Sequence, residues 1–301
     1  MARSPEFDQH ARFEGESYQD ILDRDSREAP ACLRAEQAPY LGSDSVPATH
    51  YTSQARFDLE AEHMWMRVWQ MACRVEEIPN VGDHLVYDII DKSVLIVRSA
   101  PDRIQAYYNT CLHRGRKLAT HAGNKSEFRC AFHGFTWALN GDFKSCPTPW
   151  DYQHLTNETL QLPELKVDTW GGFVFVNFDL DAPELTEAIG PLDWHFKDWH
   201  LEDRYIHYHV TKIIPCNWKV AAEAFMESQH APTTHPQIMT HVTDVNSQYD
   251  VFSDYVTRQI SAGAEPSPLL DRETVSEQRI IDDMMSRRYK MYKDVEAVPE
   301  G

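Results

Sequence analysis

Residues 111–134 of the chain read CLHRGRKLATHAGNKSEFRCAFHG. This stretch holds two pairs of side chains that bind metals well, Cys111 with His113 and Cys130 with His133. A thiolate and an imidazole this close in sequence make a metal site plausible, and two such pairs strengthen that interpretation. The sequence therefore predicts that both pairs contribute to one metal centre.

The spacing of the pairs narrows the choice of metal. Common structural zinc sites place about two to four residues between their first two ligands, whereas only Leu112 separates Cys111 from His113. Two cysteines on one iron and two histidines on the other are the ligands of a Rieske two-iron, two-sulfur (2Fe-2S) cluster. Gly115 and Gly134 follow the pairs, at points where the backbone must approach sulfide. We therefore predict such a cluster, with a Cys2His2 zinc-binding module and purely structural histidines as alternatives.

The residues around the pairs predict a small antiparallel β domain. Short runs of β-branched and aromatic residues are separated by turn signals, and Asn140-Gly141 is a strong hairpin signal. The predicted strands and hairpins cover 84–90, 93–100, 104–110, 135–145 and 170–179. The Cys-His pairs fall in loops of this sandwich or barrel.

The rest of the chain predicts helices mixed with a few strands. Apolar periodicity and turn residues indicate helices over 53–69, 184–199, 220–230 and 274–292, and strands over 204–215 and 248–262. A short helix is expected near Tyr18 to Leu22. The predicted fold class is α+β. Its predicted parts are an N-terminal segment and helix at 1–66, a β domain at 67–178 and a further domain at 179–301.

A second group of metal-binding side chains lies in NWKVAAEAFMESQHAPTTHP, residues 217–236. Glu227 and His230 are three residues apart and would share one helical face, and a turn after Pro232 would bring His235 back beside His230. Two imidazoles and one carboxylate on one side of a metal form the ligand set of ferrous oxygenases. The sequence thus predicts a second, mononuclear iron site.

These motifs resemble those of Rieske-type non-haem iron aromatic ring-hydroxylating oxygenases, in the alpha (large) subunit. The resemblance lies in CLHRG and CAFHGFTW, in the flanking NVGDH and WGGFVFVNFD, and in the N-W-K-x-x-x-E and H-x-x-x-x-H patterns, over roughly 53–301. It implies a Rieske domain placed before a helix-grip (START-like) catalytic domain. It also implies that a mononuclear Fe(II) uses electrons from the cluster to activate O2, as a dioxygenase or a monooxygenase.

The resemblance also implies roles for single residues. His230 and His235 would ligate the iron, and Glu227 would link His230 to His133 of a neighbouring subunit. The cluster ligands would be Cys111, His113, Cys130 and His133. Many family members have Asp where this chain has Glu227. The family's third iron ligand is an Asp far downstream of the histidines, so we expect a C-terminally truncated chain, an incomplete catalytic domain and a third ligand beyond residue 301.

Composition and resemblance together predict partners and location. The net charge of −18 disfavours nucleic acid and anionic membranes, and no apolar run or secretory signal is apparent, so a cytoplasmic protein is expected. Residues 103–144 are locally basic and could steer an acidic donor. The resemblance implies a ferredoxin or flavin reductase donor, a small apolar substrate of aromatic type, aromatic-hydrocarbon catabolism, and a homotrimer with or without β subunits. A Rieske electron-transfer protein or an inactive fragment is the alternative function.

Overall fold

In a computed structural model of the chain, the structure describes residues 13–42 and 44–293, without the side chains of 272 and 286–293. The chain divides into two compact units. One contains Ser53–Thr211, and the other contains Met1–Thr52 together with Lys212–Gly301. The predicted domain boundaries near 67 and 179 stay a prediction, and part of the predicted N-terminal segment, residues 1–12, lies outside the described residues.

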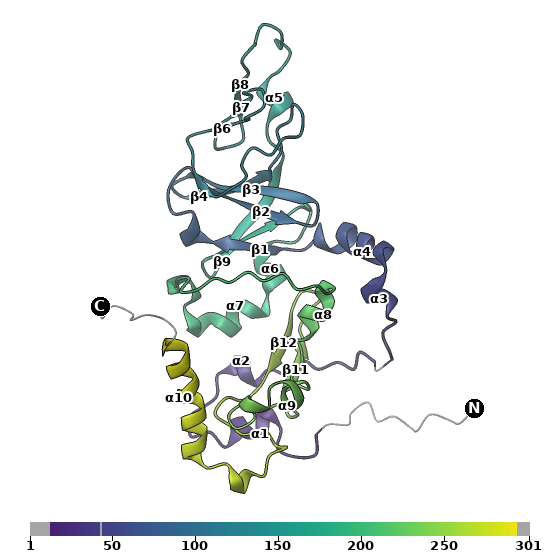
Figure 1. The fold of residues 1–301 in the computed structure, drawn as a ribbon, viewed down its shortest axis with the longest axis vertical. Helices are drawn as coiled ribbons and strands as arrows, with labels where there is room; N and C mark the ends of the chain where they lie inside the picture. Colours follow the sequence, from purple (N-terminus) through teal and green to yellow (C-terminus); the bar gives the residue numbers. More distant parts are fainter. Residues whose placement is uncertain (1–12, 43, 294–301) are drawn as a thin grey trace, which may run out of the picture. The chain divides into compact units, whose positions relative to one another are not determined.

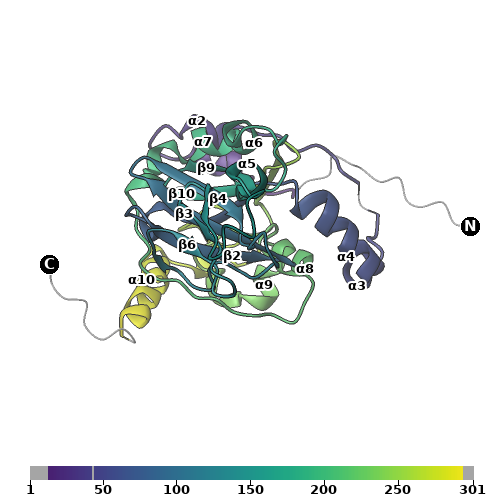
Figure 2. The ribbon, with the colours of Figure 1, turned by 90° about the horizontal axis from the view of Figure 1, so that it is seen from above.

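The unit that contains the Cys-His pairs is built on antiparallel sheets, as predicted (Figure 1). Its seven-stranded sheet has the order β1-β10-β9-β4-β3-β2-β5, and Figure 2 shows its strands from above. These strands are β1 (Gln70–Arg74), β2 (Asp83–Ile89), β3 (Lys92–Ala100), β4 (Arg103–Tyr108), β5 (Gly123–Asn124), β9 (Glu164–Trp170) and β10 (Phe173–Asn177). A three-stranded sheet contains β6 (Phe128–Arg129), β7 (Thr136–Trp137) and β8 (Phe143–Ser145).

Strand β3 separates two hydrophobic cores. Successive side chains of a strand point to opposite faces, and all four residues from Val94 to Val97 are fully buried. Val94 and Ile96 pack in one core, while Leu95 and Val97 pack in the other. The second of these cores also contains Cys111 and Cys130, so the sheet supports the loops of the candidate site directly.

A tight turn corrects the prediction of one strand over 170–179. Strands β9 and β10 pair through Trp170 and Phe173, and Gly171 and Gly172 form the turn with φ of +57° and +80°. Positive φ at both central residues is typical of a type I′ hairpin turn, which favours glycine. The Gly-Gly pair therefore ends one strand and begins the next.

Short helices of this unit precede, interrupt and follow the strands in the sequence. Ser53 caps the first helix, α4, by accepting a hydrogen bond from the backbone N–H of Arg56 at 3.3 Å, which confirms the predicted start; the helical stretch ends at Trp65, before the predicted 69. The helices are α4 (Gln54–Glu60), η1 (Ala61–Trp65), η2 (Val75–Glu77), α5 (Asn157–Leu160), α6 (Leu185–Ile189), α7 (Pro191–Phe196), η3 (Lys197–Trp199) and η4 (Leu201–Asp203).

The predicted strand over 204–215 is wrong. The alternating pattern is present, but this stretch pairs with none of the strands that the structure describes. Because no neighbouring strand covers it, Tyr208 is 82% exposed and Ile213 is 92% exposed. An alternating pattern makes a strand only where a hydrogen-bonded neighbour exists.

The second unit combines short helices with one hairpin. The predicted strand over 248–262 is two strands, β11 (Gln248–Val251) and β12 (Thr257–Ile260), which pair antiparallel. The helices are α1 (Tyr18–Asp23), α2 (Ala31–Arg34), α3 (Thr49–Thr52), α8 (Trp218–Glu223), α9 (Ala231–Thr234), η5 (Pro236–Ile238), η6 (Arg272–Thr274) and α10 (Glu277–Lys293). Helix α1 confirms the short helix predicted near Tyr18 to Leu22, and α10 confirms the helix predicted over 274–292. None of the helices within the described ranges has the length and apolar content to span a bilayer.

A buried ion pair joins the hairpin to the N-terminal segment of this unit. The Arg258 guanidinium lies 2.6 Å from Asp250 Oδ2, with side-chain exposures of 9% and 0%. Arg258 also donates to the carbonyl oxygens of Cys32 and Ala35, and Asp250 accepts from the backbone N–H of Gln37. Each charge is thus paired and hydrogen-bonded, as burial requires.

Replacing Arg258 with Met should destabilise the protein, because the Asp250 carboxylate would stay buried without its cation. The expected loss in the free energy of unfolding is about 3–5 kcal/mol. Denaturant titration measures it, with Arg279→Met as the control, because Arg279 pairs with Asp283 on the surface of α10. Equal effects of the two substitutions would contradict this account of the buried pair.

Candidate metal centres

The two Cys-His pairs lie in two loops with the same backbone pattern. In each loop the cysteine N–H donates to the carbonyl five residues later, and the glycine N–H donates back to the cysteine carbonyl. These bonds are Cys111 N to Arg116 O at 2.8 Å, Gly115 N to Cys111 O at 2.8 Å, Cys130 N to Phe135 O at 2.8 Å and Gly134 N to Cys130 O at 3.0 Å. The repeated pattern presents one cysteine and one histidine from each loop.

The glycine of each loop adopts a conformation that other residues rarely take. Gly115 has φ of +75° and Gly134 has φ of +72°, in the left-handed region where glycine alone is unstrained. A Cβ atom at Gly134 would also lie 2.9 Å from Pro147 Cγ. The backbone of both loops therefore depends on the glycines that follow the pairs in sequence.

The two cysteines face each other in the core. Cys111 is 3% exposed and Cys130 is 2% exposed. Burial raises the pKa of the Cys111 thiol, and its contact with Cys130 adds to that effect. Burial acts in the same sense on Cys130, but N–H groups of Phe132 and His133 and the Cys111 thiol lower the pKa of Cys130 below its ordinary value. Backbone N–H groups directed at sulfur stabilise thiolate, the form that binds metal.

The two histidines also face each other. The rings of His113 and His133 have centroids 4.8 Å apart at 76°, and His113 stacks on Phe135 at 4.6 Å and 7°. Burial and the neighbouring His133 lower the pKa of His113, which favours the neutral imidazole. Nδ1 of His133 is buried and has no hydrogen-bond partner among the described residues. A buried polar nitrogen without a partner is costly, and a metal ion would supply one.

The donor set therefore fits a group larger than one ion. Cysteine faces cysteine and histidine faces histidine, the arrangement in which each pair serves a different iron. Within the described residues, the one group of three His, Cys, Asp or Glu ligand atoms that all lie within 4.8 Å of one another is elsewhere, at His200, Glu202 and Asp203. A single tetrahedral zinc ion would bring all its ligand atoms within that distance of one another, and the two Cys-His pairs do not form such a group.

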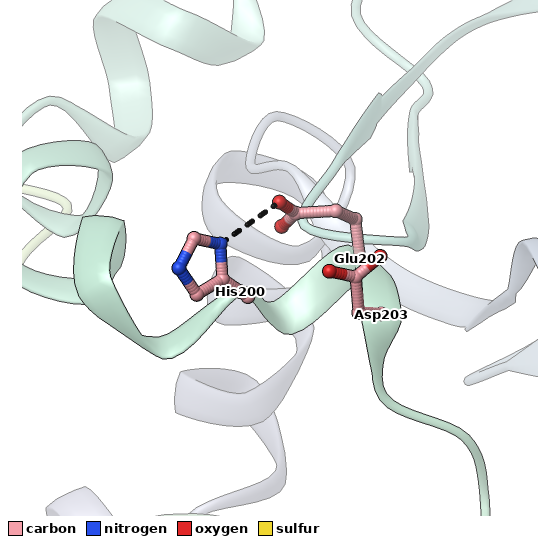
Figure 3. A group of neighbouring side chains, drawn as sticks. All are labelled: His200, Glu202 and Asp203. Atoms are coloured by element: carbon pink, nitrogen blue, oxygen red, sulfur yellow. Dashed lines mark ion pairs between the residues drawn. The ribbon is translucent and has the colours of Figure 1, made fainter.

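That other group lies on the surface. His200 Nδ1 lies 3.8 Å from Glu202 Oε1, and Figure 3 shows these two side chains with Asp203 nearby. All three side chains are exposed and come from one short helical turn, η4, and the residue before it. Exposed acidic side chains often gather in this way without a metal.

The basic character of the first site is partly neutralised. Lys117 pairs with Asp88 at 2.9 Å, and Lys144 pairs with Glu127 at 2.6 Å. Arg114 and Arg116 are exposed beside the first loop. Part of the positive charge of these loops is therefore neutralised by acidic neighbours and does not attract an approaching donor.

The second group, around Glu227, adopts a turn where the sequence predicted a helix. Helix α8 ends at Glu223, so the helix predicted over 220–230 is too long. Its next apolar residues, Phe225 and Met226, are 85% and 49% exposed. A short helix without a packed apolar face is not stable, which explains the early end.

Within this turn, the Glu227 carboxylate contacts both the ring and the backbone of His230. Its Oε1 lies 2.5 Å from His230 Nδ1, and its Oε2 accepts the His230 backbone N–H at 3.1 Å. Burial raises the pKa of Glu227, but these bonds lower it more, so its pKa lies below the ordinary value. His235 follows α9, and its ring centroid lies 5.2 Å from that of His230. The contact at Nδ1 leaves Nε2 of His230 as the atom for a metal.

No carboxylate within the described residues joins His230 and His235 as a third close ligand. Asp250 is held by Arg258, and Asp283 is bonded to Thr240 and Arg279. The structure thus brings together the two histidines and Glu227, as the sequence predicts. The ligand roles of these residues, and of the four in the first site, stay predictions.

Two protein families match separate parts of the chain. The Rieske [2Fe-2S] domain matches residues 68–158, and the ring hydroxylating alpha subunit (catalytic domain) matches residues 195–291. The first range contains both Cys-His loops, and the second contains Glu227, His230 and His235. The two families imply a Rieske cluster and a mononuclear iron.

Curated relatives include both monooxygenases and dioxygenases. The carnitine monooxygenase oxygenase subunit of Escherichia coli (strain K12) is 26% identical over 195 residues, 64% of this chain and 52% of the relative. The biphenyl 2,3-dioxygenase subunit alpha of Rhodococcus jostii (strain RHA1) is 31% identical over 193 residues, 61% of this chain and 42% of the relative. The chain thus spans about half the length of the curated relatives it matches.

The solved structures that the chain resembles also include both a monooxygenase and a dioxygenase. A quaternary ammonium Rieske monooxygenase, described for carnitine oxidation and inter-subunit electron transfer, has a TM-score of 0.62 at 26% identity, over 65% of this chain and 55% of that chain. A naphthalene 1,2-dioxygenase has a TM-score of 0.54 at 30% identity, over 62% and 44%. The chain thus contains a Rieske domain and a ring-hydroxylating alpha subunit catalytic domain, and the relatives that it matches are Rieske oxygenase alpha subunits.

Proposed function

We propose that the chain acts as the terminal oxygenase component that receives electrons at a Rieske cluster and uses them at a mononuclear iron to oxidise a small organic substrate. The observation that carries this proposal is the first site, where two matching loops pair cysteine with cysteine and histidine with histidine. The buried Nδ1 of His133, which has no hydrogen-bond partner among the described residues, supports it, because a metal ion would satisfy that nitrogen.

At the first site, Cys111 and Cys130 would hold one iron as thiolates, and His113 and His133 would hold the other through neutral imidazoles. When bound, the cluster supplies one-electron transfer. The backbone N–H groups that point at the two sulfurs stabilise negative charge there and so make the reduced state easier to reach. The neutral imidazoles act in the same direction, because they add no negative charge.

At the second site, His230 and His235 would bind iron, which supplies dioxygen activation when present. Glu227 does not need to be a ligand. Its carboxylate accepts the Nδ1 proton of His230 and so fixes the ring and its tautomer. We propose that Glu227 also contacts His133 of a neighbouring copy. This requires an oligomer, for which a homotrimer is proposed, and inter-subunit electron transfer in the carnitine-oxidising relative supports it.

The proposed substrate is a small quaternary ammonium compound. Monooxygenases of carnitine, glycine betaine and choline are among the relatives, and the net charge of −18 favours the approach of a cation. The aromatic substrate predicted from sequence is the second candidate, because biphenyl and naphthalene dioxygenases are relatives as well. A ferredoxin or a flavin reductase is the proposed electron donor.

Replacing His133 with Ala should remove the cluster, because one iron would lose a ligand. In anaerobically purified protein, acid-labile sulfide should fall to near the detection limit, and iron should fall by the amount that the cluster contributes, leaving the mononuclear iron. His154→Ala is the control, since His154 is exposed in the same unit. Full iron and sulfide in the His133 variant would contradict the assignment, and stoichiometric zinc in place of iron would support the zinc-module alternative.

Glu227→Gln should keep both metals and lose electron transfer between them. The rate at which dioxygen and substrate reoxidise the reduced cluster should fall about 10- to 100-fold, the usual effect of losing a group that orients a ligand. Glu273→Gln, an exposed change in the same unit, should leave the rate unchanged. A wild-type rate in the Glu227 variant would contradict its bridging role.

The iron content of the unmodified protein tests the alternative function. If the wild-type chain holds iron for the cluster alone, this would support the electron-carrier alternative.

Substrate class can be tested with the reduced, iron-loaded protein. Carnitine, glycine betaine or choline should stimulate oxygen uptake and yield an oxidised product, while biphenyl and naphthalene should not. The products are identified by mass spectrometry, with His230→Ala as the inactive control. Stimulation by the aromatic compounds alone would overturn the quaternary ammonium assignment and favour the second candidate.

A further inference from the structure

Ser228 sits between Glu227 and His230 and is the most firmly held residue of their turn. Its backbone N–H donates to the Tyr249 hydroxyl at 3.0 Å, and its carbonyl accepts the backbone N–H of Ala231 at 3.0 Å, at the start of α9. Its side chain is buried, at 8% exposure for the residue. The turn therefore has one fixed point, close to its centre.

The hydroxyl contacts of Ser228 define which groups donate. Its Oγ lies 2.8 Å from the Asp244 carbonyl, 2.9 Å from Ser247 Oγ and 2.7 Å from the Tyr249 hydroxyl. A carbonyl only accepts, so the Ser228 proton goes to Asp244. Tyr249 already accepts the Ser228 N–H, and its own proton can then go to Ser228 Oγ. Tyr249 thus makes two bonds to one residue.

Tyr249 lies on β11, beside its partner strand β12 (Figure 1). The hairpin is anchored in turn by the buried Asp250 and Arg258 pair, and Asp250 is the next residue after Tyr249. The hydroxyl of Tyr249 is therefore carried by a rigid element rather than by a loop. Its position sets the position of Ser228, one residue from Glu227 and two from His230.

We propose that Tyr249 is a positioning residue for the mononuclear iron site. By holding Ser228 at both N–H and Oγ, it keeps the Glu227 carboxylate directed at Nδ1 of His230 and so keeps Nε2 directed at the metal. The inference rests on the proposed function, in which His230 binds iron. It assigns to the iron site a residue of the hairpin that contacts neither histidine in the interactions that the structure describes.

The test is a set of Fe(II) titrations on the full chain with its cluster, after a chelator has removed mononuclear iron. Competition with a chromophoric chelator gives the Kd for Fe(II). Tyr249→Phe removes only the hydroxyl and should raise the Kd about tenfold, and Ser228→Ala should act in the same direction. Tyr255→Phe is the matched control, because Tyr255 follows the same strand and is 52% exposed; its Kd should equal the wild-type value.

Repeating the titrations in a Glu227→Ala variant separates a positioning role of Tyr249 from a general destabilisation of the turn. If Tyr249 acts through Glu227, Tyr249→Phe should change the Kd by less than about twofold once Glu227 is Ala. An equal loss in both backgrounds, or no loss in either, would overturn the proposal. His230→Ala tests the premise: weakened Fe(II) binding there keeps the proposed iron site whatever Tyr249 does, while wild-type binding would overturn both.

Discussion

The candidate cluster site depends on one constraint: the two buried thiols must lie beside each other, and the two imidazoles must lie beside each other. Each loop satisfies this constraint by turning back on itself through a glycine with positive φ, which buries the cysteine and places the histidine near the surface. Strand β3 fills the cores on both sides of the sheet beneath. The loops can be short because the sheet provides the rigidity, and local bonds from N–H groups to sulfur set the charge of the pair.

The second site follows a different principle. Its helix, α8, ends at Glu223, before the ligands. The Glu227 carboxylate, rather than a helix, holds His230 in place, because it contacts both the backbone N–H and the ring of that residue. Such a turn needs an external support, which the hairpin supplies through Ser228 and Tyr249. In both sites, therefore, an antiparallel β element supports a ligand turn through groups that would not themselves touch the metal.

The arrangement of side chains at the first site could be predicted from the sequence because the determinants of each loop are local. Cysteine, histidine and glycine of each loop lie within five residues of one another, and the hairpin signal at Asn140-Gly141 holds, with Gly141 at φ of +84°. Features that depend on distant partners were missed or wrong. The alternating stretch 204–215 has no strand to pair with, and the support of Ser228 comes from a residue 21 positions away. Hydrophobic periodicity carries no signal for a hydroxyl that bridges two segments.

The reduction potential of the iron-sulfur centre tests the central claim, mixed ligation by two cysteines and two histidines, most directly. Potentiometric titration of anaerobically purified protein, followed by the visible absorbance and the paramagnetic signal of the reduced state, gives this value. Mixed ligation predicts a midpoint between about −150 and +300 mV. A midpoint of about −400 mV, the value typical of a cluster with four cysteine ligands, or the absence of a reducible iron centre, would contradict the account.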